Sequence, residues 1–558
     1  MKFKNLTQED KDYFKKIYLD KSIKWDERIS ILKEYADISG RTVERWAAKL
    51  NLKKVSEVES PEFKKAKDRK FNRKKKRFII TWAQNNTPVH ERFLSNIEAY
   101  ANHVKADIHV IAGRYKNPTS VFSDIKYDVW HDRITKYLDA ARHDVHKYVS
   151  IMSDVKVQPT AVNPMTGMQG MSGINSCVFG SPRVQMEMIP VLEGCKPKMM
   201  VTTGSCTVSN YTDSKSGKKG EFNHTLGFTI IEIKDDETFF IRQVTADSNG
   251  DFIDLFNSVK FKGESIELEF DSTIDQVNWS SSNFGADPIV WKGESIVSRI
   301  DEIDACILGD IHYGHEDQEV LKTTLDFLSV VKPKHIVLHD VFDGYSISHH
   351  EMKDPFAQYR KEVKGTNSLK SEINYMLDQL EVFNKFEDCN VVIVRSNHDD
   401  FIDRWLKNGD WKKQPTPKNS MEYMEYSQIL LRQYSEDESV KGVIPELISN
   451  KFPEFITLGR SDSYIVNGWE LAQHGDIGSS GSRGSLQQFR KLNTKIIVGH
   501  YHAPGRKDGA ISVGTTTHLR VGYNVGASGW LQSHVLILPN GKAQHINFID
   551  GEFTTLKW

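Results

Sequence analysis

The sequence contains few cysteines and no long apolar run. Its 558 residues include five scattered cysteines, and none of them forms a C-x-x-C pair. A zinc ribbon or a disulfide framework is therefore not indicated, and we expect buried free thiols. No stretch reaches the ~18 apolar residues of a membrane span, and the charged N-terminus lacks the apolar core of a signal peptide. These absences predict a cytoplasmic protein without a membrane partner.

The net charge of −1 is the sum of a basic head and an acidic body. Residues 1–77 hold 24 Lys and Arg against 13 Asp and Glu, and ten of these basic residues fall within 64–77, including Lys74, Lys75 and Lys76. A basic head of this kind is typical of a polyanion-binding appendage, and its charge density suits phosphate backbone without reading of sequence. A solvated, flexible tether is the competing interpretation.

Residues 1–60 are predicted to form a small helical domain that resembles a helix-turn-helix. Apolar residues at helical spacing predict a helix over about 28–35 with Asp26 as its cap. After a glycine turn at 37–40, a second helix is expected over 41–50, where Arg41, Arg45 and Lys49 recur every four residues. A basic outer stripe on the second helix fits DNA binding. An ordinary helical hairpin with a solvated basic face explains the pattern equally well.

A change of pattern at Phe78 predicts an α/β domain over 78–299, joined to the helical domain by the basic linker 61–77. A helix is expected over 90–104, and strands over 78–83, 108–111, 148–152, 228–233 and 239–244. Residues 205–223 are predicted to form an exposed loop that lacks the G-x-x-x-x-G-K-[ST] spacing of a nucleotide loop. The sequence indicates no role for this domain.

From Ile303 onward, five short apolar strands each end in metal-binding residue types. The strands are predicted at 305–308, 335–338, 391–394, 469–472 and 495–498, and the residues that follow them are Asp310, His312, Asp340, Asp343, Asn397, His398, His474, His500 and His502. Ligands gather at the carboxyl ends of strands in α/β sheets, so we expect these side chains to converge on one site. A single segment of this kind is often a surface turn, but five in succession indicate a binding site.

The types of donor atom restrict the metal. Carboxylate, imidazole and amide oxygen without thiolate favour Mn²⁺, with Fe²⁺, Zn²⁺ or Mg²⁺ as alternatives. Seven ligands exceed what one ion takes from a protein, which predicts two divalent ions bridged by a carboxylate and a hydroxide. That pair would direct the hydroxide at a phosphorus, so the expected chemistry is phosphoester hydrolysis.

The order D-x-H, G-D-x-x-D, G-N-H-[D/E], H and G-H-x-H resembles that of the calcineurin-like metallophosphoesterases. The resemblance covers about residues 300–535 and implies a β-sandwich flanked by helices over 300–558. It implies two groups of metal ligands, namely Asp310, His312 and His502 for one ion, and Asn397, His474 and His500 for the other. It also implies that Asp340 bridges the ions, that His398 stabilises the transition state or protonates the leaving oxygen, and that Asp343 orients His398.

The chain departs from the family pattern in ways that bear on its substrate. His339 and Ser396 replace the glycines that precede Asp340 and Asn397. The arginine that follows the second Asp in protein phosphatases is absent, and Asp399 replaces their usual Glu. These differences argue against a Ser/Thr phosphatase.

Two insertions, 344–390 and 400–468, separate the motifs, and the second interleaves Arg404, Trp405 and Trp411 with further basic and aromatic residues. Such a mixture suits phosphate tracking with base stacking, although a helical cap that fills its own core is the alternative. With the basic head, it favours the DNA-repair nuclease branch of the family. A long N-terminal portion before a phosphoesterase also resembles bacteriophage proteins that degrade host DNA. This layout implies a Mn²⁺-dependent deoxyribonuclease in the host bacterial cytoplasm.

Two other functions are compatible with the motifs. A small-molecule phosphodiesterase or phosphatase of the same family, acting on cyclic nucleotides or nucleotide sugars, would leave the basic head unused. A DNA-binding regulator with an inactive phosphoesterase domain would normally have lost ligands, and none is missing here. A homo-oligomer stays open, because related nucleases are often dimers but the sequence carries no interface signal.

Overall fold

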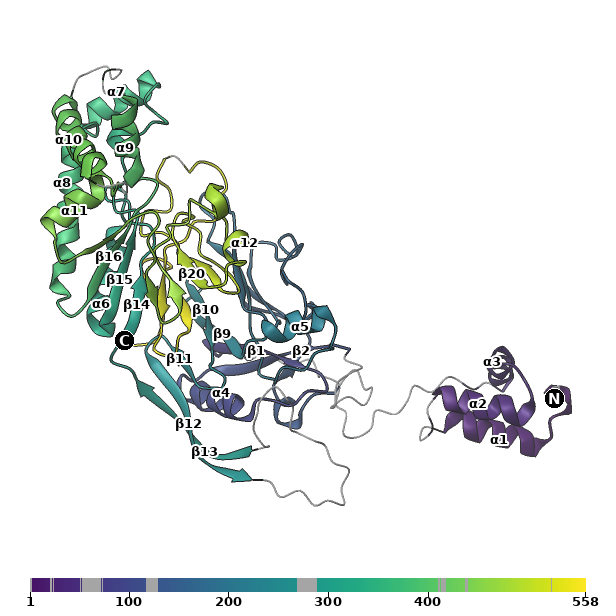
Figure 1. Ribbon diagram of the computed structural model, residues 1–558. Coiled ribbons are helices and arrows are strands. Elements are labelled where there is room, and N and C mark those ends of the chain that lie inside the picture. The colour runs from purple at the N-terminus through teal and green to yellow at the C-terminus, as the bar shows by residue number, and fades with distance from the viewer. Residues whose placement is uncertain are drawn as a thin grey trace. The chain divides into compact units, whose positions relative to one another are not determined.

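The computed structural model describes residues 3–20, 23, 25–50, 52, 72, 74–116, 129–267, 289–409, 412, 418–436, 440–522 and 524–557. The chain divides into two compact units, Met1–Lys65 and Ala66–Trp558, which are considered separately below. Figure 1 shows the elements of each unit. Among the described helices, none is long and apolar enough to cross a membrane.

The N-terminal unit contains the 3-10 helix η1 (Phe3–Asn5) and the helices α1 (Gln8–Leu19), α2 (Trp25–Ala36) and α3 (Gly40–Lys49). Phe14, Leu32, Val43 and Trp46 form its buried core. The two helices predicted from apolar spacing are confirmed. Helix α2 begins before Asp26, so this residue lies in the first turn and is not the cap expected from the sequence. The three helices of this unit thus pack around one apolar core.

A five-stranded sheet in the order β10-β9-β1-β2-β3 forms the first layer of the larger unit. Its strands are β1 (Arg77–Gln84), β2 (Asp107–Gly113), β3 (Leu138–Asp139), β9 (Gly227–Ile233) and β10 (Phe239–Thr245). Helix α4 (Glu91–His103) packs Phe93 and Ile97 against one face, where Ile79, Val110 and Ile230 are buried. The strands and the helix predicted for this region are confirmed.

A ten-stranded sheet packs against the other face of the five-stranded sheet, through Trp82 and Ile111 on one side and Ile151, Val178 and Val201 on the other. Its order is β18-β19-β20-β22-β21-β7-β8-β6-β5-β4. The strands are β4 (Arg142–His146), β5 (Val149–Met152), β6 (Ser176–Phe179), β7 (Gln185–Ile189), β8 (Lys198–Thr202), β18 (Ile465–Val466), β19 (Trp469–Glu470), β20 (Lys495–Val498), β21 (Gly505–Lys507) and β22 (Ala510–Ser512).

A six-stranded sheet, β17-β16-β15-β14-β23-β24, faces the C-terminal strands of the ten-stranded sheet. Its strands are β14 (Ile303–Ile307), β15 (Pro333–His339), β16 (Asn390–Val394), β17 (Ile456–Leu458), β23 (Ser533–Ile537) and β24 (Ala543–Asn547). Ile307, Val337 and Val392 meet Leu471 and Ile497 across a buried layer. This arrangement is a β-sandwich, and with the helices it confirms the predicted α/β class.

Helices cover the outer face of the six-stranded sheet, where Ile336 and Ile393 share a core with Phe327, Ile373 and Ile448. The helices of this region are α6 (Gln318–Val331), α7 (Pro355–Lys364), α8 (Leu369–Leu380), α9 (Asp399–Asn408), α10 (Ser420–Glu436) and α11 (Val443–Lys451), and all of them except α7 contribute residues to this core. Figure 1 shows α7 to α11 grouped together beyond the end of β15 and β16. The two insertions of the sequence therefore build a helical cap over this end of the sandwich.

The remaining elements are short or lie at the edge of the unit. They are the sheet of β11 (Phe252–Asp254), β12 (Asn257–Glu267) and β13 (Ile289–Arg299), the helices α5 (Lys215–Phe222) and α12 (Leu486–Phe489), and the 3-10 helices η2 (Asp132–Ile134), η3 (Tyr345–Ile347), η4 (Glu381–Lys385) and η6 (Ser479–Gly481).

The sequence boundary at residue 300 does not coincide with a boundary between compact units. Strand β21 pairs with β7 through Arg506–Met186 and Lys507–Gln185, so the ten-stranded sheet contains strands from both sides of residue 300. An edge strand exposes unpaired N–H and C=O groups, and this pairing satisfies them. Such long-range pairing leaves no mark in local sequence patterns.

One local expectation differs from the structure, and a second, that of buried free thiols, holds in part. Within the predicted loop 205–223, residues 215–222 form helix α5, whose Ser214 Oγ accepts a hydrogen bond from the Gly217 N–H at 3.1 Å. Gly217 and Gly220 are buried in this helix, where the lack of a side chain allows close packing on Thr212 and Tyr211. These glycines are therefore explained by close packing and not by backbone flexibility. The cysteines are free as expected; Cys177, Cys206 and Cys306 are buried, Cys389 is half-buried and Cys195 is exposed.

A buried ion network lies between β9, β10 and β11. The Arg242 guanidinium donates to Asp254 Oδ1 and Oδ2 at 2.6 and 2.7 Å and to Glu232 Oε2 at 2.6 Å. Both acidic side chains are fully buried. Loss of the arginine would therefore remove the cation paired with the buried Asp254, whereas Glu232 would keep its ion pair with Arg77 at 3.1 Å.

We expect Arg242→Ala to lower the free energy of unfolding by about 3–5 kcal/mol, because it removes the cation paired with the buried Asp254 and one of the two paired with Glu232. Thermal and urea unfolding followed by circular dichroism would measure the loss. The matched control is Arg142→Ala, which removes a half-exposed pair with Asp154 and should change stability by about 0–1 kcal/mol. Equal effects of the two substitutions would show that the network contributes no more than a surface ion pair.

Candidate metal centre

The sandwich brings the ends of five strands together. Strands β14, β15 and β16 run parallel in the six-stranded sheet, and β19 and β20 run parallel in the facing sheet. The predicted ligands follow these strands by one to five residues. The convergence expected from the sequence is thus achieved by two stacked sheets rather than by the edge of one.

The first group of side chains surrounds His312. Its Nε2 lies 3.0 Å from His502 Nε2 and 3.4 Å from Asp340 Oδ2. His502 Nε2 is in turn 3.3 Å from Asp310 Oδ2. Two imidazole nitrogens and two carboxylate oxygens at such spacing point at a common position, and His312, Asp340 and His502 could hold a metal ion.

The second group surrounds Asn397. Its Oδ1 lies 3.1 Å from His474 Nε2 and 3.1 Å from His500 Nδ1. His474 Nε2 is also 3.1 Å from Asp340 Oδ2, the oxygen that takes part in the first group. The structure therefore brings all seven predicted ligands together in two groups that share the carboxylate of Asp340.

Unsatisfied buried oxygens show that these groups fit cations. Both carboxylate oxygens of Asp310 and Oδ1 of Asp340 are buried and have no hydrogen-bond partner among the described residues. Burial, followed by the charge of Asp340, raises the pKa of Asp310 to about 7. Buried carboxylates without partners are costly, and a divalent ion is the partner that this set of oxygen and imidazole donors suits.

The backbone at the strand ends holds the ligands in a rare conformation. His312, Asp340, His500 and His502 have positive φ angles of 49°, 46°, 76° and 54°. Non-glycine residues seldom adopt this region, and its strain is concentrated at functional sites. At Gly499 a Cβ atom would lie 2.3 Å from Asp310 Oδ1, so a side chain there would collide with the group around His312.

The unusual His339 is accommodated beside the second group. It is fully buried, and its Nδ1 lies 3.4 Å from Nδ1 of His474. A Cβ at Gly499 would come within 3.0 Å of the His339 side chain, so this glycine leaves the room that the larger residue needs. The departure from the family pattern therefore does not displace a ligand.

His398 lies next to the two groups, with its ring 4.5 Å from that of His312. Its Nδ1 is 2.6 Å from the main-chain oxygen of Asp343, whereas the Asp343 carboxylate lies 3.8 Å away. That carboxylate instead accepts a hydrogen bond from His312 Nδ1 at 2.9 Å, which lowers the pKa of Asp343 to about 2 against the opposing effect of burial. Asp343 thus fixes His398 mainly through its backbone, and its side chain orients His312.

Several neighbours of the centre carry no motif and were missed in the sequence. The Trp530 ring lies 4.1 Å from His502, the Phe401 ring lies 4.5 Å from His398, and His315 Nε2 lies 3.7 Å from Asp343. Phe401 follows the Asn397-His398 motif by one helical turn, which was an available signal. Trp530 is remote from every motif and is brought in only by the fold.

A cavity of about 330 Å³ opens beside Asp343. Its lining includes Tyr345 and Tyr375, Lys364 from the end of α7, and the buried Tyr313, whose Oη has no hydrogen-bond partner among the described residues. One wall therefore comes from the centre and the other from the helical cap. The cavity offers aromatic, cationic and hydroxyl groups next to the predicted ligands.

The cap residues singled out in the sequence have different surroundings. Trp405 is buried and packs on Tyr423 with rings 5.3 Å apart, so it belongs to the core of the cap. Arg404 is exposed and its Nη1 lies 3.4 Å from His349 Nε2, beside Phe401. Trp411 lies outside the described residues. The mixture of basic and aromatic residues is therefore partly core and partly surface.

The predicted DNA contacts lie on the surface. Arg41, Arg45 and Lys49 are exposed on α3. Lys74 and Lys76 are exposed, and Lys75 is half-buried with its Nζ 3.4 Å from the Lys105 carbonyl oxygen. The linker expected over 61–77 falls mostly outside the described residues.

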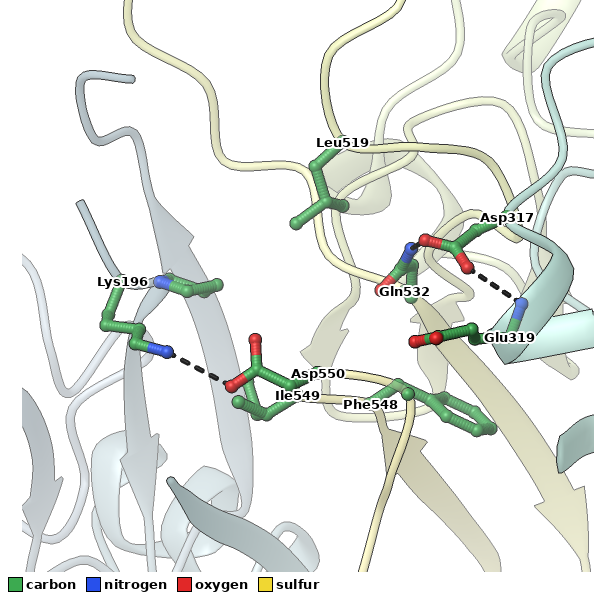
Figure 2. Close-up of a pocket in the computed structure, with 10 residues that line it drawn as sticks. Lys196, Asp317, Glu319, Leu519, Gln532, Phe548, Ile549 and Asp550 are labelled. Atoms are coloured by element: carbon green, nitrogen blue, oxygen red, sulfur yellow. Dashed lines mark hydrogen bonds and ion pairs between the residues drawn. The ribbon is translucent and has the colours of Figure 1, made fainter. Parts of the chain in front are cut away.

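A separate pocket of about 340 Å³ has a different character (Figure 2). Asp317, Glu319 and Asp550 line it, and its one lysine, Lys196, pairs with Asp550 at 3.1 Å. None of the predicted metal ligands takes part in this lining. Its acidic walls do not suit a phosphate group.

Comparison with known proteins gives one similarity over nearly the full length. The chain is 28% identical over 552 residues to Protein A1 of Escherichia phage T5, a match that covers 96% of this chain and 87% of that protein. The similarity supports a phage protein of the T5 type. No family model matches the chain. No solved structure matches it either.

We expect the chelator-treated protein to bind two Mn²⁺ per chain, measured by isothermal titration calorimetry. Asp340→Asn should weaken the binding of both ions, because both groups share this carboxylate. The loss of affinity should exceed the ~10–100-fold that is typical when a residue hydrogen-bonded to a metal ligand is removed. Asp388→Asn is the matched control, since Asp388 is exposed and remote from the strand ends. Unchanged Mn²⁺ binding by Asp340→Asn would contradict the shared ligand.

Proposed function

We propose that the protein is a two-metal nuclease, encoded by a phage, that hydrolyses phosphodiester bonds of host DNA in the bacterial cytoplasm. The observation that carries the proposal is the position of the Asp340 carboxylate. It lies 3.4 Å from His312 Nε2 and 3.1 Å from His474 Nε2, between two groups that each combine imidazole and oxygen donors. A pair of divalent ions bridged by one carboxylate is the arrangement used for phosphoester hydrolysis.

Two ions would be held by three ligands each. Asp310, His312 and His502 would hold one, and Asn397, His474 and His500 would hold the other. When bound, such a pair supplies the nucleophile and neutralises the charge of the phosphate. We take Mn²⁺ as the preferred ion because oxygen and imidazole donors occur together without thiolate.

His398 is the proposed catalytic residue among those that do not bind metal. Its Nδ1 is occupied by the Asp343 carbonyl oxygen, which leaves Nε2 to face a substrate. An imidazole in this position can donate a hydrogen bond to a phosphate oxygen or a proton to the leaving oxygen. Asp343 is a positioning residue, because it fixes both His398 and His312.

DNA is favoured as the substrate by features outside the metal groups. The cavity beside Asp343 contains tyrosine rings and Lys364, which suit a base and its phosphate. Exposed Arg41, Arg45 and Lys49 lie on one helix, and a cluster of basic residues suits phosphate backbone. Similarity to a T5 protein supports an action during infection, when host DNA is available.

The second candidate is a small-molecule phosphodiesterase of the same chemistry. The 330 Å³ cavity favours it, because this volume suits one nucleotide. A small-molecule function would leave the basic head, residues 1–77, without a role. An inactive, DNA-binding regulator is disfavoured, because no ligand position is substituted.

His398→Ala should reduce turnover by about 10²–10⁴-fold while Mn²⁺ binding is kept, since the lost group transfers or shares a proton and is not a ligand. Hydrolysis of bis-p-nitrophenyl phosphate and calorimetric Mn²⁺ titration would be measured on the same sample. His350→Ala is the control, because His350 is exposed and its ring lies against His349 and edge-on to Phe401, with centroids 3.9 and 6.4 Å away. Loss of the ions along with activity would mean that His398 is a ligand.

We expect purified protein to degrade duplex DNA with Mn²⁺ and to be inactive with chelator. Linear and closed circular DNA should be compared with Mn²⁺ and Mg²⁺, with Asp340→Asn as the inactive control, and products followed on gels. Attack on circles would show that free ends are not required. If neither DNA form is cut while bis-p-nitrophenyl phosphate is hydrolysed, the small-molecule function replaces the nuclease.

A further inference from the structure

A second cavity, of about 510 Å³, lies away from the predicted metal ligands. It is lined near the start of β20 by Lys495, whereas His500 follows the other end of this strand. Four basic residues take part in the lining, namely Arg490, Lys495, Arg506 and Lys542, and the acidic residue among them is Asp508. This composition is opposite to that of the acidic pocket in Figure 2.

Arg506 is the most deeply buried of these cations. It is buried, its Nη1 donates to the Ala543 carbonyl oxygen at 3.2 Å, and its Nε has no partner among the described residues. Asp508 does not neutralise it, because the Asp508 carboxylate bonds Arg183 Nη1 at 3.0 Å and Gln185 Nε2 at 3.3 Å. Burial lowers the pKa of Arg506 to about 10, although the charge of Asp508 acts against this.

Lys542 precedes Ala543 and adds a second charge at the same place. Burial lowers its pKa, and the positive charges of Lys495 and Arg506 lower it further, with Asp247 opposing them. Within the described part of the chain, no ion pair joins either Arg506 or Lys542 to an acidic residue. Lys495 is placed over the Trp469 ring, 5.3 Å from its centroid.

Like charges held together at a partly dry wall are unfavourable unless an anion joins them. The free Nε edge of a guanidinium binds an oxyanion with two parallel hydrogen bonds, and a lysine beside it adds a point charge. The lining contains four basic residues and one acidic residue, so it suits the charge of a phosphate better than that of a single carboxylate. We propose that this cavity is a second, metal-independent site that binds the phosphate of a mononucleotide.

The other walls suit the rest of such a ligand. Trp469, Val184 and Leu492 provide apolar surface, and Phe222 at the end of α5 is 87% exposed. A volume of 510 Å³ lies within the range of about 300–1,000 Å³ that small-molecule sites occupy. The proposal does not depend on the nuclease function, although mononucleotides would be products of that reaction.

The test is calorimetric titration of the full-length protein, kept in chelator, with adenosine 5′-monophosphate and with adenosine. We expect adenosine 5′-monophosphate to bind and adenosine to bind at least about tenfold more weakly, because the charge-assisted hydrogen bonds to the phosphate are lost. Lys542→Gln should weaken nucleotide binding to a similar degree. Lys491→Gln removes the same charge from an exposed neighbour outside the cavity and should bind like the wild type.

Arg506→Gln serves as a second variant, with thermal unfolding recorded to show that it folds. Bis-p-nitrophenyl phosphate hydrolysis with Mn²⁺ should be unchanged in Lys542→Gln, which separates this site from the metal centre. Equal binding of nucleotide by the wild type and Lys542→Gln would overturn the proposal. Absence of binding by the wild type, or equal affinity for adenosine, would do so as well. None of these results depends on whether DNA is cut.

Discussion

The buried carboxylate of Asp340 is the interaction on which the centre depends. Its side chain is 1% exposed and lies within 3.4 Å of imidazole nitrogens from two sheets. A buried carboxylate close to Asp310 would repel it unless cations stood between them, so the two acids and the histidines are stable together only as a set. The positive φ of Asp340 and the close approach at Gly499 then follow, because the strand ends must turn sharply to present this set.

The sandwich supplies the rigidity that such a set requires. Two parallel strands from one sheet and three from the other are fixed by an apolar layer that includes Ile307, Val337 and Ile497. The ligand turns are therefore attached to buried strands, while the cap helices that line the neighbouring cavity come from insertions between them. Because the cavity wall and the ligands belong to different segments, the residues of the cap can change without moving the ligands. Variable segments on a rigid scaffold are commonly used in this way.

The sequence predicts those features that are recorded locally. An apolar strand followed at once by Asp, Asn or His is visible within ten residues, so the five strands and the convergence of the seven proposed ligands could be predicted. The pairing of β21 with β7, the Asp343 carbonyl contact with His398 and the packing of Trp530 on His502 depend on residues far apart in the chain. Helix α5 was missed because Gly217 and Gly220 are ordinary loop signals, and only their contacts explain why a helix forms.

Charge is buried with opposite sign at the two ends of β20. Beyond its carboxyl end, Asp310 and Asp340 leave oxygens without partners, and near its start Arg506 leaves an N–H without one. In sequence these residues look alike, as single charged positions beside apolar strands. They differ once folded, because the neighbours of the acids are neutral or cationic imidazoles and the neighbours of Arg506 are further cations. The first environment suits metal ions and the second suits the anion that we propose, so the two ends of β20 differ in the charge of the ligand that they favour.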